Sequence, residues 1–98
     1  MALAVEIGSL IDRQPDIRGG RPKIAGTGAT VRRIVGYYNA GMSPEDIALE
    51  YPHVNLAQVQ AALTYYHANR EEIEADIAEE DKVVAYWERR LGREPKQW

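Results

Sequence analysis

The chain has 98 residues, of which 45% are hydrophobic and 28% charged, and its formal net charge at pH 7 is -3. This length allows one modest hydrophobic core, so we expect one folded domain with at most an appendage. The lack of cysteine excludes a disulfide framework, a thiolate zinc site and a cysteine nucleophile. No signal peptide is visible, and no apolar run reaches the roughly 18 residues of a membrane span. We therefore expect a cytoplasmic protein without membrane contact.

Charge is unevenly distributed along the chain. Residues 1–40 hold six basic and three acidic side chains, a net charge of +3, whereas residues 71–98 hold five basic and nine acidic ones, a net charge of -4. Two surfaces with different partners would produce this asymmetry, and so would two solvated faces. The sequence leaves both interpretations open.

The first third of the chain is rich in glycine and proline, which predicts short strands and turns rather than helices. The candidate strands are residues 9–13 and 22–25, and a turn at residues 26–28 closes the second. A two-stranded ribbon of this size is marginal in water, so it must pack on the helices or on a second copy of itself. A homodimer is therefore expected.

A helical period begins at Thr30, which is a suitable N-cap, and Gly41 provides the stop of this first helix. Ser43 and Pro44 give the next start signal, because serine caps a helix and proline fits its first turn. Pro52 ends this short second helix, since proline lacks the amide hydrogen that a helix interior requires.

The third predicted helix starts at Asn55, which resembles a capping box together with Gln58. Two helices joined by a tight turn, with a helix before them, match the helix-turn-helix arrangement. We therefore predict a mainly α fold: a short N-terminal β-ribbon and a three-helix helix-turn-helix core in residues 1–70, followed by a long C-terminal amphipathic helix. Bundles that touch no nucleic acid share this arrangement, so the fold alone does not decide function.

Residues 71–98 form a predicted acidic helical tail for partner binding. Its apolar positions are Ile73, Ile77, Val84, Trp87 and Leu91. A coiled-coil seam through them would place Arg70 and Glu80 at interior positions, so a single amphipathic helix that meets another subunit or protein explains the pattern better. Asn69 with Glu72 could begin a separate helix. Helical spacing spreads the carboxylates around the polar face, where we expect solvation.

The sequence offers no catalytic or metal site. His53 and His67 fall on different elements and lack neighbouring carboxylates at metal-ligand spacing. No serine or threonine has a base near it in the pattern, and the glycine-rich turns lack the lysine of a P-loop. We expect a protein that is not an enzyme and that binds no cofactor.

DNA contact depends on basic side chains more than on the third helix. The outward face of that helix has no basic residue, although Gln58 could read an adenine edge and Thr64 a thymine methyl or a phosphate. The stronger positive set comprises Arg13, Arg18, Arg21, Lys23, Arg32 and Arg33. These side chains are the predicted DNA-binding groups; solubility and local ion pairs are the alternative role.

Three segments, residues 17–27, 41–47 and 51–52, resemble the bacterial family known as domain of unknown function 433. The resemblance covers residues 11–73 and rests on the elements Gly-Gly-x-Pro-x-Ile-x-Gly-Thr and Gly-x-Ser-x-Glu-x-Ile. The family is grouped with helix-turn-helix proteins, and many members resemble VapB-type antitoxins encoded beside a PIN-like nuclease toxin. The resemblance implies a dimeric antitoxin that binds operator DNA, represses its own operon and neutralises its toxin. Family members commonly have an arginine where this chain has Gly28, so no role of that arginine is carried over.

Two parts of the chain would carry the two roles that the resemblance implies. The basic first third and the core would form the dimer and DNA surface, and the tail would engage the toxin. PIN-like nucleases gather carboxylates around a metal, so a cationic side chain can compete for that site. The candidate cations are Arg89, Arg90 and Arg93, and the candidate apolar anchors are Trp87, Leu91 and Trp98. The alternative is a protein-interaction or oligomerisation module with no DNA-binding role.

Overall fold

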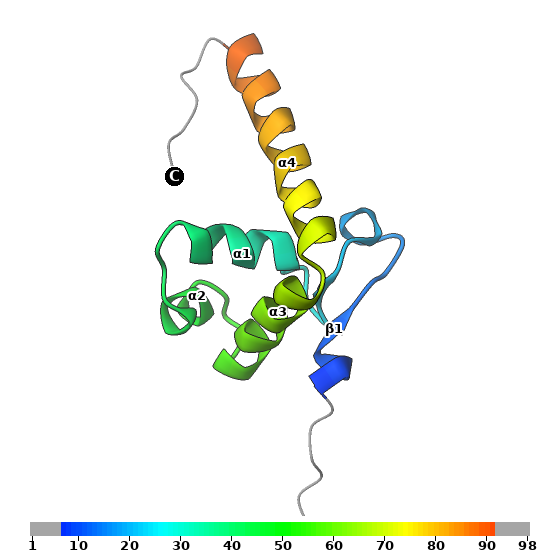
Figure 1. Ribbon diagram of the computed structural model, residues 1–98, viewed down its shortest axis with the longest axis vertical. Coiled ribbons are helices and arrows are strands. Elements are labelled where there is room, and N and C mark those ends of the chain that lie inside the picture. Colours follow the sequence, from blue (N-terminus) through cyan, green and yellow to red (C-terminus); the bar gives the residue numbers. More distant parts are fainter. Residues whose placement is uncertain (1–6, 92–98) are drawn as a thin grey trace, which may run out of the picture.

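The computed structural model describes residues 7–91, which form four α-helices, two short strands and two 3-10 helices (Figure 1). The elements are η1 (Ile7–Leu10), β1 (Ile11–Asp12), η2 (Arg18–Gly20), β2 (Lys23–Ile24), α1 (Val31–Asn39), α2 (Pro44–Leu49), α3 (Leu56–Ala68) and α4 (Arg70–Arg90). The predicted mainly α fold, with its N-terminal ribbon and long C-terminal helix, is confirmed.

The helix starts follow the capping signals of the sequence. The Thr30 side chain accepts a hydrogen bond from the Arg33 amide, and the Ser43 side chain accepts one from the Asp46 amide. At α3 the capping box is complete, because Asn55 Oδ1 accepts from the Gln58 amide at 2.9 Å and Gln58 Oε1 accepts from the Asn55 amide at 2.8 Å. Gly41 adopts a φ of 104°, which lets the chain leave α1 in the left-handed region.

The ribbon is shorter than the predicted strands. β1 and β2 pair antiparallel, with Ile11 opposite Ile24 and Asp12 opposite Lys23. The residues before β1 form η1 instead, although the Ala25 amide still donates to the carbonyl of Leu10 at 2.8 Å. The ribbon packs on α3, and this contact supplies the support that an isolated ribbon lacks.

The core lies where α1, α2, α3 and the ribbon meet. The fully buried side chains at its centre include Ile24, Val31, Ile34, Val35, Ile47 and Val59. α3 contacts both preceding helices and the ribbon, so more than one stripe of it is buried. Ala61 is therefore buried, whereas Leu56 at the start of the helix is exposed.

α4 is a separate helix, as Asn69 suggests, because the backbone of that residue leaves the helical region (φ -136°, ψ 46°). The first half of α4 packs against α1 and buries Ile73 completely. Its second half extends away from the other helices (Figure 1). One helix thus belongs to the core at one end and lies outside it at the other.

Candidate functional site

Basic side chains from the first 40 residues gather against one face of α4. Arg13, Arg21, Arg32 and Arg33 form ion pairs with Glu72, Asp76 and Glu80. We call the four arginines the arginine cluster and the three carboxylates the acidic row. The carboxylates follow one another at intervals of four residues, so they lie on one face of the helix.

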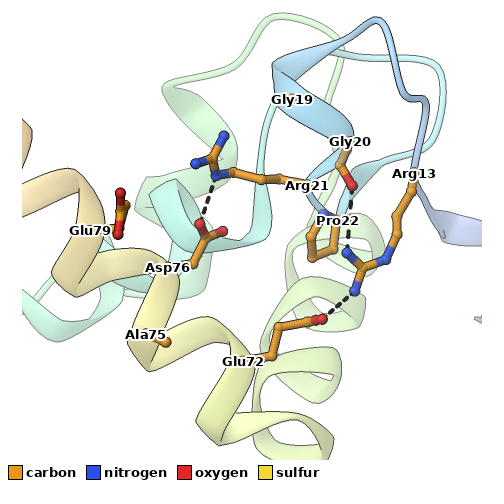
Figure 2. A pocket seen from close by; sticks show the side chains of 9 residues that line it. All are labelled: Arg13, Gly19, Gly20, Arg21, Pro22, Glu72, Ala75, Asp76 and Glu79. Carbon is orange, nitrogen blue, oxygen red and sulfur yellow. Dashed lines mark hydrogen bonds and ion pairs between the residues drawn. The ribbon is translucent and has the colours of Figure 1, made fainter.

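The first pair of this site joins Arg13 to Glu72, as Figure 2 shows. Arg13 Nη2 lies 2.6 Å from Glu72 Oε2 and also donates to the Tyr65 hydroxyl at 2.8 Å. That hydroxyl in turn donates to Glu72 Oε1 at 3.0 Å. The hydrogen bond from Arg13 to Glu72 is the main reason that the pKa of Glu72 is lowered and the pKa of Arg13 raised. Both groups therefore stay charged over a wide range around neutral pH.

Asp76 stands at the centre of the site. Its Oδ1 lies 2.6 Å from Arg21 Nε and 3.4 Å from Arg32 Nη1. Only 14% of the Asp76 side chain is exposed, so the carboxylate needs these charged donors to offset its loss of water. This contact ties the loop before β2 and the start of α1 to the same residue of α4.

Glu80 ends the acidic row and binds two neighbouring residues of α1. Its Oε2 lies 2.9 Å from Arg32 Nε, and its Oε1 lies 3.1 Å from Arg33 Nη2. Each oxygen of the carboxylate thus has its own guanidinium. The carboxylates of the acidic row are consequently not simply solvated, as their spread around a polar face suggested, but are ion-pair partners within the chain.

The turn at η2 positions Arg21 for this contact. Arg18, Gly19 and Gly20 all have positive φ values of 51°, 66° and 76°. A Cβ on Gly19 would lie 2.7 Å from Arg21 Nη1, so glycine leaves the space that the guanidinium occupies. An open pocket of about 470 Å³ lies between this turn and α4 (Figure 2). Its walls carry charges of opposite sign that already pair across it.

Lys23 is the predicted DNA-binding residue whose placement differs most from a surface cation. Its side chain is 0% exposed, and Nζ lies 2.7 Å from Asp12 Oδ1. Neither atom has a hydrogen-bond partner of good geometry among residues 7–91, so the two are held as an ion pair. In this conformation the lysine has no surface to offer to a phosphate.

The remaining predicted DNA-binding residues lie apart from the arginine cluster or have local roles. Arg18 Nε donates to the carbonyl of Gly28 at 3.2 Å. Gln58 uses its side-chain oxygen in the capping box, and Thr64 is exposed on α3. Of the eight predicted DNA-binding residues, the four of the arginine cluster lie together, and they lie against α4.

The predicted partner-binding residues divide into two groups along α4. Ile73 is buried in the core and Ile77 packs against it. Val84, Trp87 and Leu91 are exposed, with 53% of Trp87 and 61% of Leu91 accessible. Arg89 and Arg90 are exposed at the same end. Arg93 and Trp98 lie outside the described residues.

Two exposed apolar residues beside this group were not among the predicted ones. Val83 and Tyr86 are 51% and 48% exposed, and the Tyr86 ring meets the Trp87 ring edge-on at 5.3 Å. The Arg90 guanidinium lies 5.5 Å from the centre of the Tyr86 ring. A heptad-like stripe through Val84 and Trp87 passes beside these residues, which is why the spacing did not select them. We call Val83, Val84, Tyr86, Trp87 and Leu91 the distal apolar face.

Residues 7–91 contain neither a candidate metal site nor a candidate membrane span. No three histidine or acidic side chains there gather in a way that could hold a metal ion. No helix in the same part of the chain is both long enough and apolar enough to cross a membrane. The arginine cluster and the distal apolar face are therefore the two candidate sites.

Comparison with known proteins places the sequence motifs in a family. A family model described as "Protein of unknown function (DUF433)" matches residues 11–66. The chain is also similar to the crystal structure of a DUF433 member protein from Anabaena variabilis ATCC 29413, with 30% identity and a TM-score of 0.68, over 71% of this chain and 69% of that one. No curated protein matches the chain. The family match contains the arginine cluster and ends before α4.

Proposed function

This chain belongs to the DUF433 family, and we propose that it is an antitoxin-type binding protein that holds a partner protein on the distal half of α4. The observation that carries the proposal is the distal apolar face, whose side chains are exposed and do not belong to the core. Single exposed apolar residues are common on soluble proteins, but a group of them on one projecting helix is typical of an interaction site.

The distal apolar face continues an apolar stripe that is buried in the first half of α4. Val84, Trp87 and Leu91 follow Ile73 and Ile77 at helical spacings, so all five lie on the same side of α4. α1 and the core cover the first two. No part of residues 7–91 covers Val84, Trp87 and Leu91 as completely as the core covers Ile73. These three residues therefore form an apolar stripe that a second molecule can bind.

The resemblance supplies the class of partner, a PIN-like nuclease. Such an enzyme gathers carboxylates around its metal, and Arg89 and Arg90 stand exposed beside the distal apolar face. Trp87 and Tyr86 would be the apolar anchors, and the arginines the cations that compete at the acidic site. Recognition by a rigid helix would need little ordering on binding.

Binding of operator DNA as a dimer is the second part of the antitoxin proposal, and a module without a DNA-binding role is its alternative. The pairing of the arginine cluster with the acidic row lowers the DNA affinity that we expect of wild type, because paired guanidiniums attract phosphate weakly. A gel-shift titration of the wild-type chain with the DNA upstream of its gene, at several salt concentrations, separates the two. Specific binding with a steep salt slope supports the repressor.

Trp87→Asp tests the partner site. Against the nuclease encoded beside the gene, we expect the variant to bind at least about 30-fold more weakly than wild type in calorimetry, since central aromatic anchors contribute about 2 kcal/mol or more. Leu49→Asp is the matched control, because Leu49 is an exposed apolar residue of α2, away from α4. Equal affinity of wild type and Trp87→Asp, or no binding by wild type, would contradict the proposal. Sedimentation shows whether the face pairs with a second copy instead.

A further inference from the structure

We infer that the arginine cluster is a binding site for the phosphate backbone of duplex DNA, and that the acidic row of α4 occupies this site within the chain. DNA and the acidic row would then compete for the same guanidiniums. The inference rests on the DNA-binding part of the proposed function and is independent of the partner site on the distal apolar face.

The geometry places four cations from three segments along one row. Arg13 follows β1, Arg21 precedes β2, and the other two lie in the first turn of α1. Opposite them, the carboxylates of the acidic row succeed one another with a rise of about 6 Å per four residues of helix. A regular line of negative charges on a rigid rod is also what a nucleic-acid backbone presents. The acidic row therefore resembles a polyanion bound at the arginine cluster.

Charge balance decides whether the site can attract DNA. With α4 docked, the four guanidiniums face three carboxylates, and Glu79 adds a further negative charge at the edge of the pocket. The local charge is then close to zero, and phosphate gains little. With the acidic row neutralised, the four guanidiniums and Glu79 would leave a local charge of +3, and each guanidinium that meets a phosphate would release a counterion.

Ion pairs and apolar burial both hold α4 against the rest of the chain. The Arg13–Glu72 pair, with side chains 46% and 43% exposed, contributes about 0–1 kcal/mol. The Asp76 and Glu80 side chains are only 14% and 25% exposed, so removal of their charge costs more. Burial of a side chain such as Ile73 contributes about 1.5–3 kcal/mol. Asparagine and glutamine keep an oxygen that accepts hydrogen bonds from the same guanidiniums, and Ile73 stays buried, so we expect the helix to remain in place when the carboxylates are neutralised.

The test compares two triple variants with the same change in net charge. Glu72→Gln/Asp76→Asn/Glu80→Gln removes the acidic row, and the control Glu50→Gln/Glu71→Gln/Asp81→Asn removes carboxylates that form no ion pair with the arginine cluster in the described residues. Both retain the shape of the side chains. Binding is measured by fluorescence anisotropy with a duplex of the DNA upstream of the gene, at several salt concentrations, and circular dichroism checks the fold.

We expect the acidic-row variant to bind this duplex about tenfold or more tightly than wild type, with a steeper salt dependence, and the control to behave as wild type. Adding Arg21→Ala and Arg32→Ala to the acidic-row variant should abolish the gain. If the triple variant does not fold, the single variant Asp76→Asn replaces it. We expect Asp76→Asn to bind the duplex more tightly than wild type, by a smaller factor than the triple variant.

An equal gain in both triple variants would overturn the inference, because net charge alone would then explain it. No gain in the acidic-row variant or in folded Asp76→Asn would overturn it as well. Calorimetry with the partner nuclease separates this failure from failure of the proposed function: a variant that binds the nuclease but gains no DNA affinity refutes only the competition. A gain in DNA affinity without nuclease binding by wild type refutes only the partner site.

Discussion

Glu72 shows how one surface carboxylate of α4 acquires a structural role. It accepts hydrogen bonds from Arg13 and from the Tyr65 hydroxyl, and its pKa is lowered chiefly by the first of these. Because the unfolded chain lacks these donors, the folded state holds the ionised form more strongly. The contribution is fully present above the unfolded pKa, about 4.3, and is lost as the pH falls through the lower folded value.

We therefore predict that Glu72→Gln reduces the acid sensitivity of the fold. Wild type should lose more stability than the variant between about pH 6 and pH 3, by less than about 1 kcal/mol, because 43% of the Glu72 side chain is exposed and solvent screens the pair. Urea unfolding at several pH values measures the difference. Glu71→Gln, one residue away, is the control and should keep the wild-type profile; the same acid sensitivity in all three proteins would contradict the prediction.

Residue type alone did not reveal where the charges lie. The sequence predicts that Lys23 is a surface cation, yet its side chain is fully buried beside Asp12. That burial depends on the antiparallel register of β1 and β2, which sets Asp12 opposite Lys23. Nothing local to the lysine encodes this pairing, so the sequence could not predict it.

At the scale of elements, the local sequence was sufficient to predict where the first three helices start. Thr30, Ser43 and Asn55 each cap a helix that starts at the next residue, because short polar side chains satisfy amide groups that have no partner within the helix. The ribbon is harder to predict, since its ends depend on contacts with α3 rather than on propensity.

The cap of α3 gives the prediction at this scale. Asn55→Ala removes the acceptor for the Gln58 amide, and we expect the free energy of unfolding to fall by about 1 kcal/mol. Asn39→Ala, at the exposed end of α1, is the matched control and should change it by less than about 0.5 kcal/mol. Chemical denaturation of the two variants beside wild type measures both changes; equal effects would show that the capping box contributes nothing specific.

At the scale of the molecule, the charge asymmetry of the sequence acquires a different meaning. A basic front and an acidic back suggested two surfaces for two partners, or two solvated faces. The arginine cluster and the acidic row instead meet, because α4 passes beside the start of α1 and the turn at η2. Only the tertiary arrangement determines which charges face each other, so the sequence could supply the two charge sets but not their pairing.

The division of α4 into a docked half and a projecting half leads to the last prediction. Backbone hydrogen bonds within a helix are similar along its length, so differences in amide exchange report how its side chains are packed. We expect the amides around Ile77 to exchange more slowly than those around Trp87, because the first half is covered by α1 and the second is not.

Substitution and salt should then act on the docked half with different strengths. Ile73→Ala removes a fully buried side chain, which costs about 2–5 kcal/mol, and should speed exchange throughout the first half of α4. Salt at about 1 M shortens the screening length to about 3 Å and weakens only the exposed ion pairs, so it should speed exchange less. Val83→Ala, on the projecting half, should leave exchange around Ile77 unchanged. If salt has the larger effect, the ion pairs and not the apolar anchor hold α4 in place, and the acidic row could not be neutralised without releasing the helix.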